Sequence, residues 1–177
     1  MNTSPRLRML LPHWVIEARV RQVCRQIRRM YLDLPLFAVV REGGTRFMDE
    51  IRSHLQDVET IDIRCHSYRG TERGQLSIDP IPRSDMKKIW QREVVVIDDI
   101  MDSGRTIGAV CDLLESMGAK EARAAVLLTR PQGGATVLPP RVITTCFWAP
   151  DTAFVVGFGM DLFFNDTATT EIYTLEK

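Results

Sequence analysis

Apolar residues change their spacing along the chain, and this change predicts strands that alternate with helices. Short apolar runs at residues 36–40, 94–97 and 124–128 each stop at polar residues, which is typical of buried strands. Elsewhere apolar residues recur every three or four positions, as expected of helices with one buried face. These helical stripes are Val20, Val23, Cys24 and Ile27; Phe47, Met48, Ile51 and Leu55; and Ile107, Val110, Cys111 and Leu114.

The alternation predicts the α/β class, with a mainly parallel twisted sheet flanked by helices. Further strand candidates lie at 59–65, 141–148 and 153–160. Residues 66–85 are polar and contain several glycines and prolines, so we expect a long loop, which in a compact domain is usually functional. There is no internal repeat, and 177 residues with 45% hydrophobic content suit one domain.

Three polar segments follow the predicted strands directly. They are REGG (41–44), DDIMDSGRT (98–106) and TRPQGG (129–134). In parallel sheets, ligands bind beyond the carboxyl ends of the strands. We therefore expect these three segments to converge on one cleft.

Charge narrows the classes of partner. The chain has 23 lysines plus arginines and 23 aspartates plus glutamates, so no overall field favours nucleic acid or an anionic membrane. Most of the basic residues are arginines. Five of them share the polar face of the first predicted helix, where we expect them to be solvated: Arg19, Arg21, Arg25, Arg28 and Arg29.

Cysteine content and hydropathy bear on the compartment. The four cysteines are scattered without a CxxC pair, which favours free thiols in a reducing compartment over disulfides or zinc. No apolar run approaches the roughly 18 residues of a membrane span, and the first residues lack a secretory apolar region. We therefore expect a cytoplasmic protein without a membrane partner.

The segment DDIMDSGRT combines two kinds of ligand chemistry. The Asp98–Asp99 pair is a set of acceptors suited to sugar hydroxyls or a divalent cation. The segment is neither a Walker A loop nor a GxGxxG motif. A response-regulator receiver also has an acidic pair after a strand, but too few residues follow this pair for that domain. The residues before the predicted helix offer N–H groups and hydroxyls to a phosphate: Ser103, Gly104, Arg105 and Thr106.

With this segment the chain resembles type I phosphoribosyltransferases, whose phosphoribosyl-pyrophosphate motif is an apolar strand, two acidic residues and a loop of small residues. Over roughly residues 12–162 it is similar to hypoxanthine-guanine phosphoribosyltransferases, whose features recur in order. They are a GG loop (40–44), a Ser-Tyr pair (67–68), the motif itself, LLTRP (127–131) and PDTAFVVGFGMD (150–161). The resemblance implies the type I phosphoribosyltransferase fold, with a small hood and a mobile lid loop.

The resemblance also implies a purine salvage activity. A 6-oxopurine, hypoxanthine or guanine with xanthine as a further candidate, would receive the 5-phosphoribosyl group of phosphoribosyl pyrophosphate. The reaction would depend on Mg²⁺ and release pyrophosphate, and family members usually form homodimers or homotetramers. The alternative hypothesis is a nucleotide- or RNA-binding regulator with weak or no catalysis, motivated by Glu42 and by the basic face of the first helix.

Site residues are carried over from the resemblance. The catalytic base near purine N7 is Asp102, whose structural alternative is an N-cap of the following helix. Phosphoribosyl-binding residues are Asp98, Asp99, Asp102, Ser103, Gly104, Arg105 and Thr106, and pyrophosphate-binding residues are Arg41, Glu42, Gly43 and Gly44. Purine-binding residues are Arg130, Phe154, Val155 and Asp161; lid residues are Ser67 and Tyr68; metal-binding residues are Asp98, Asp99 and Asp161.

The chain departs from the family pattern at three points. Arg130 stands where the family usually has a lysine that donates to the purine 6-oxo group, and arginine keeps the charge in a larger planar fork. Glu42 replaces another usual lysine, although Arg41 can compensate. The unusual cis peptide of this loop is expected between Arg41 and Glu42. An arginine that helps to bind pyrophosphate is missing after Asp161.

The last residues have a different origin on our interpretation. Residues 165–174, NDTATTEIYT, match the translation of a common sequencing-library adapter. We therefore expect one phosphoribosyltransferase domain over residues 1–164 and a non-native tail over 165–177, from which no function is inferred.

Overall fold

The computed structural model describes residues 6–67, 76–130, 138–149, 154–160 and 170–176. The helices are α1 (His13–Met30), α2 (Gly44–His54), α3 (Arg83–Ile89) and α4 (Arg105–Ser116). The strands are β1 (Arg6–Leu11), β2 (Leu36–Arg41), β3 (Thr60–Ser67), β4 (Leu76–Ile78), β5 (Glu93–Met101), β6 (Glu121–Thr129), β7 (Val142–Trp148), β8 (Val155–Gly157) and β9 (Ile172–Glu176).

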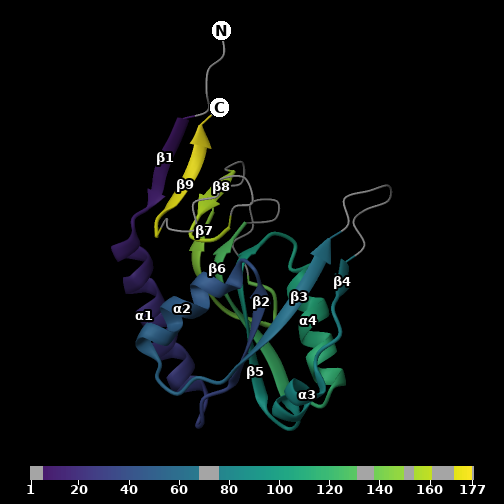
Figure 1. Ribbon diagram of the computed structural model, residues 1–177. Helices are drawn as coiled ribbons and strands as arrows, with labels where there is room; N and C mark the ends of the chain where they lie inside the picture. The colour runs from purple at the N-terminus through teal and green to yellow at the C-terminus, as the bar shows by residue number, and fades with distance from the viewer. Residues whose placement is uncertain (1–5, 68–75, 131–137, 150–153, 161–169, 177) are drawn as a thin grey trace.

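A six-stranded sheet with the order β4-β3-β2-β5-β6-β7 forms the centre of the molecule. All neighbouring strands from β3 to β7 pair in parallel, and only β4 runs antiparallel, against β3. Helices α1 and α2 lie on one side of this sheet and α3 and α4 on the other (Figure 1). The predicted α/β class with a mainly parallel sheet is confirmed.

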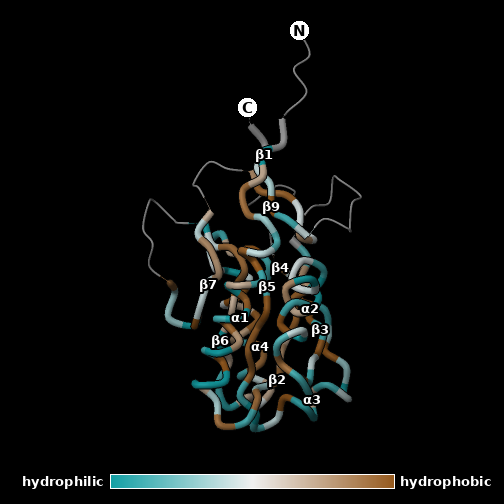
Figure 2. Tube along the Cα trace, turned by 90° about the vertical axis from the view of Figure 1, so that its left-hand side faces the viewer, coloured by the Kyte–Doolittle hydropathy of each residue, from teal (hydrophilic) through white to brown (hydrophobic). Residues whose placement is uncertain are grey.

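Alternate side chains of the central strands enter two separate hydrophobic cores. Phe37 and Val39 of β2 belong to the core that α1 and α2 cover. Leu36 and Ala38 belong to the core that α3 and α4 cover. A strand buried on both faces has no polar side to alternate with, which explains the continuous apolar runs. Figure 2 shows this hydrophobic character along β5.

A second, three-stranded sheet has the order β1-β9-β8 and is antiparallel throughout. It lies beyond the carboxyl end of the main sheet, in the place expected of a hood (Figure 1). Residues 153–160 were predicted to contain a strand, and β8 lies there, paired with β9 of this second sheet. Strand β1 was not predicted. Strand β9 lies in the tail predicted to be non-native, and its Ile172 is fully buried.

Two further boundaries differ from the sequence prediction. Strand β5 continues through the acidic pair to Met101 because it stays paired with β6 as far as Thr129. Residues 66–85, expected to be one long loop, contain β4 and the first turn of α3. The predicted mobile lid falls mostly on residues 68–75, which lie outside the described residues.

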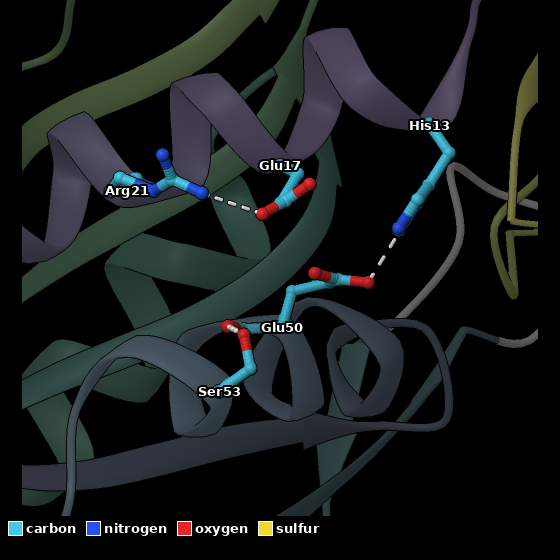
Figure 3. Close-up of polar contacts among 5 residues, drawn as sticks. All are labelled: His13, Glu17, Arg21, Glu50 and Ser53. Carbon is cyan, nitrogen blue, oxygen red and sulfur yellow. Dashed lines mark hydrogen bonds and ion pairs between the residues drawn. The ribbon is translucent and has the colours of Figure 1, made fainter.

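Helix α1 is tied to its neighbours by polar contacts. Arg19 was expected to be solvated, and this prediction is wrong: its Nε donates to Cys146 O at 3.0 Å and an amino group donates to Thr145 O at 3.0 Å. A helical pattern cannot show that the carbonyls of β7 lie within reach of this face. On the side facing α2, His13 Nδ1 lies 3.8 Å from Glu50 Oε1 (Figure 3).

The four cysteines are free thiols, as predicted. Burial raises the pKa of Cys24, Cys65 and Cys111 to about 11 and the pKa of Cys146 to about 12. Their thiolates are therefore scarce at neutral pH, and reactivity towards electrophiles is low. No helix among the described residues is long and apolar enough to cross a membrane.

The contact between α1 and β7 should contribute to stability. Arg19→Ala removes a charged donor from two backbone carbonyls, so the free energy of unfolding should fall by about 1–3 kcal/mol in urea denaturation. Arg25→Ala, at an exposed position of the same helix, is the matched control and should stay within about 0.5 kcal/mol of the parent. Equal losses in the two variants would contradict the role given to Arg19.

Candidate active site

The acidic pair lies at the carboxyl end of β5 and is removed from water. Asp98 is 6% exposed and Asp99 is 9% exposed. The Asp99 N–H donates to Asp98 Oδ1 at 3.0 Å, and the Ile100 N–H donates to Asp99 Oδ1 at 2.8 Å. Burial raises the pKa of both carboxyl groups, and the charge of Asp99 raises the pKa of Asp98 further. No ion pair to either residue is found within the described part of the chain.

The loop after β2 packs directly on this pair. A Cβ atom added at Gly43 would overlap the Asp99 carboxyl group, and one added at Gly44 would meet the carbonyl of Ile97. Glycine at both positions therefore lets the backbone of the loop approach β5. The peptide between Arg41 and Glu42 is cis, which confirms the expected position of this bond. Arg41 makes an exposed ion pair with Asp62, with 3.5 Å between NH1 and Oδ1.

The loop after β5 ends in a helix N-terminus. Gly104 is the N-cap of α4 and has a φ of 72°, a left-handed conformation that favours glycine. The Arg105 N–H lies 3.5 Å from Ser103 Oγ, and the Arg105 side chain is exposed. The N-cap alternative for Asp102 is wrong, because Gly104 takes that position. Apart from this long contact at Arg105, no side chain among the described residues caps α4, so its next N–H groups are available to an anion.

Arg130 meets Asp102 across the same edge of the sheet. Its NH1 lies 3.2 Å from Asp102 Oδ1, and its backbone N–H donates to Met101 O at 2.9 Å. The Asp102 side chain is 56% exposed and that of Arg130 is 27% exposed. The Nε atom of Arg130 is buried and has no hydrogen-bond partner among the described residues. This side chain therefore keeps a donor for a further partner.

The other predicted site residues are only partly described. The Phe154 side chain is 51% exposed, and Val155 is buried where β8 pairs with β9. Ser67 ends β3, and its side chain is not described; Tyr68 and Asp161 lie outside the described residues. The first two predicted segments meet where Gly43 packs on Asp99, and the third meets the second where Arg130 pairs with Asp102. Residues 131–134 of the third segment lie outside the described residues.

One contact at this edge was missed by the sequence interpretation. Gly159 has a φ of 84°, and a Cβ added there would lie 2.9 Å from Arg46 Cγ and 4.0 Å from Gly43 O. The turn after β8 therefore packs against the Arg46 side chain and also approaches the loop 41–44. The sequence indicated Arg46 only as a polar residue early in the second helix.

A divalent cation fits the donor set at the end of β5. Among the described residues, no group of three His, Cys, Asp or Glu side chains could hold a metal ion. Mg²⁺ commonly uses only one or two carboxylates and completes its shell with substrate phosphates and water. Two buried carboxyl groups without a cationic partner meet that requirement.

Comparisons with known proteins agree with this geometry. The family described as Phosphoribosyl transferase domain matches residues 9–162. A hypoxanthine-guanine phosphoribosyltransferase of Streptococcus mutans is 32% identical over 130 residues, which are 72% of this chain and 69% of that protein. The Bacillus subtilis enzyme of the same name is 27% identical over 87% of this chain and 84% of its own length.

A solved structure extends the similarity to the fold. The hypoxanthine phosphoribosyltransferase of Trypanosoma cruzi, in complex with the product IMP, has a TM-score of 0.79 at 22% identity, covering 99% of this chain and 97% of its own. The chain therefore belongs to the phosphoribosyltransferase family. Within that family it is similar to hypoxanthine-guanine phosphoribosyltransferases, and the resemblance inferred from the sequence is confirmed.

Stability should depend on pH through the acidic pair. The pKa values of Asp98 and Asp99 are raised in the folded state, so this state binds more protons than the unfolded chain. The contribution of the pair to the free energy of unfolding is then fully present at low pH. It is lost as the pH rises through the pKa values that the two carboxyl groups have in the folded state. Asp98→Asn should be more stable than the parent in metal-free urea denaturation, by a margin that grows as pH rises above the ordinary pKa of a carboxyl group.

An exposed carboxylate provides the control for this pH dependence. Asp49→Asn removes a carboxylate that is 57% exposed and paired with Arg52. The difference in free energy of unfolding between this variant and the parent should stay constant over the same rise in pH. A constant margin for Asp98→Asn would contradict the assignment.

Proposed function

We propose that the chain catalyses Mg²⁺-dependent transfer of the 5-phosphoribosyl group from phosphoribosyl pyrophosphate to a 6-oxopurine, with release of pyrophosphate. One observation carries the proposal: Gly43 packs against the buried Asp99 carboxyl group at the end of β5. The carboxyl groups of Asp98 and Asp99, which accept hydrogen bonds, are thus flanked by the loop 41–44 on one side. The loop 103–106 follows the same strand, and both loops offer backbone N–H groups. Phosphoribosyl pyrophosphate has the matching order, with ribose hydroxyls between a 5′-phosphate and a pyrophosphate.

Asp98 and Asp99 are assigned to the ribose hydroxyls and to Mg²⁺. When bound, Mg²⁺ neutralises charge on the pyrophosphate oxygens. Burial and mutual repulsion raise the pKa of the two carboxyl groups. A cation bound beside them would favour their charged form and so offset both effects, which supports this assignment. Asp161 is assigned to the same site from the family resemblance alone.

Asp102 is assigned as the general base. The reaction breaks the C1–O bond to pyrophosphate and forms a C1–N bond to the purine, which must lose a proton. Positive charge develops on the ribose in such substitutions, so a carboxylate near the ring favours the transition state. The half-exposed Asp102 carboxyl group can reach a ligand at this edge of the sheet, and it would take the proton near purine N7.

Arg130 is assigned to recognition of the purine 6-oxo group. A guanidinium group donates hydrogen bonds and cannot accept them, so it favours a 6-oxo oxygen over a 6-amino group. The unpartnered Nε of Arg130 supports this role. Phe154 would stack on the purine with its exposed ring, and the Val155 backbone would bind the purine edge. Ser67 and Tyr68 would close over the sugar and exclude water.

The regulator hypothesis has weaker support. Its basic face on α1 includes Arg19, which donates to β7, and Arg21, which pairs with Glu17 at 2.6 Å. Those contacts leave fewer arginines for a nucleic acid. A steep dependence of RNA binding on salt concentration, together with inactivity on every purine, would favour the regulator.

The proposal also covers the cellular compartment of the protein, its oligomeric state and the origin of its last residues. Four free cysteines, three of them buried, support a reducing compartment, and we assign the cytoplasm. We expect self-association as a homodimer or homotetramer, supported by the exposed side chain of Trp14 (70%).

We also propose that residues 165–177 are a non-native tail, supported by a family match that ends at residue 162.

Replacing the base should separate chemistry from binding. Asp102→Asn should lower kcat for hypoxanthine by about 100-fold or more, since general-base catalysis typically contributes 10²–10⁴-fold. The KM for phosphoribosyl pyrophosphate should change little in a pyrophosphate-release assay. Asp112→Asn, on the exposed side of α4, is the control and should keep full activity. Loss of substrate binding in proportion to kcat would move Asp102 to a structural role.

The side chain at position 130 should decide between 6-oxo and 6-amino purines. Arg130→Met should raise the KM for hypoxanthine by about 10-fold or more, because a charged hydrogen bond to the base is lost. Arg130→Lys, which keeps a charged donor, should retain use of hypoxanthine and guanine. Adenine should remain a poor substrate of the parent protein. An unchanged KM in Arg130→Met would remove Arg130 from the purine site.

A further inference from the structure

The loop proposed to bind pyrophosphate has little positive charge of its own. Glu42 adds a negative charge within the loop, and Asp99 lies directly against Gly43. The nearest basic residue in sequence, Arg41, pairs with Asp62 at 3.5 Å. Pyrophosphate is a polyanion, and its binding needs cations as well as backbone N–H groups.

Arg46 lies where such a cation is needed. It is the third residue of α2, which begins directly after the loop. A Cβ added at Gly159 would lie 2.9 Å from its Cγ, 3.4 Å from its Cβ and 4.0 Å from Gly43 O. The turn after β8 therefore packs against the aliphatic stem of Arg46 beside the loop, and the positive φ of Gly159 makes room for it.

The guanidinium group of Arg46 is not used elsewhere in the described structure. The side chain is half-buried, and no hydrogen bond or ion pair joins it to another described residue. Arg52, near the other end of α2, differs in this respect: it donates to Asp49 Oδ1 at 3.0 Å and to Thr60 Oγ1 at 2.9 Å. A stem fixed by packing and a head without a partner are what an anion-binding arginine requires.

We propose that Arg46 holds the pyrophosphate group of phosphoribosyl pyrophosphate and of the released product, across the loop 41–44. The inference rests on the proposed function and adds to it a residue that offsets Glu42. It also gives a role to the Gly159 turn, which keeps the arginine stem beside the loop.

The test separates the two ends of the substrate. Arg46→Ala should weaken binding of pyrophosphate, and raise the KM for phosphoribosyl pyrophosphate, by about 10-fold or more, as expected for loss of a charged hydrogen bond. Arg46→Lys should recover part of this loss. Binding of inosine monophosphate, which lacks pyrophosphate, should change less than about twofold in calorimetry, because Arg46 is assigned to the pyrophosphate group alone.

The matched control is Arg52→Ala on the same helix, which should leave both affinities unchanged. If Arg46→Ala binds pyrophosphate as the parent does, or loses both ligands equally, the inference is overturned. A parent protein that binds neither pyrophosphate nor phosphoribosyl pyrophosphate would instead overturn the proposed function.

Discussion

Two adjacent carboxyl groups buried at the end of β5 impose a constraint on everything around them. Asp98 and Asp99 lie in a strand whose other residues from Val94 onward are apolar, and burial raises the pKa of both carboxyl groups. Two backbone N–H groups satisfy part of their hydrogen-bonding capacity. The remaining acceptors point to a ligand that brings hydroxyl groups or a divalent cation. A chain selected only to fold has no reason to keep such a pair, because apolar residues there would cost less.

The loops at this edge are shaped by that pair. Gly43 and Gly44 allow the loop after β2 to touch β5, and Gly104 starts α4 from a left-handed conformation. Around these backbone donors the chain uses arginine: Arg130 meets Asp102, and Arg46 lies beside the loop 41–44. Planar guanidinium groups bind carboxylates and phosphates with defined geometry. On the proposed function, one edge of the sheet thus combines a sugar site with two anion sites.

Much of this arrangement could be predicted because it depends on regular patterns. Apolar runs and helical stripes predicted the central strands and three of the four helices, and parallel topology predicted that their loops converge. The hood was expected only from the family resemblance. The residue pattern predicted one of its strands, within residues 153–160, and missed β1, because these short antiparallel strands pair over long sequence distances. Contacts of single side chains were missed for a related reason: no local pattern shows that Arg19 reaches β7 or that Gly159 packs on Arg46.

The central claim is that the acidic pair and its two flanking loops form one sugar-phosphate site. A crystal structure with inosine monophosphate and Mg²⁺ tests it most directly. The account predicts the 5′-phosphate against residues 103–106 and the ribose hydroxyls within hydrogen-bond distance of Asp98 or Asp99. Density for the nucleotide at another surface, with this edge of the sheet empty, would contradict the account.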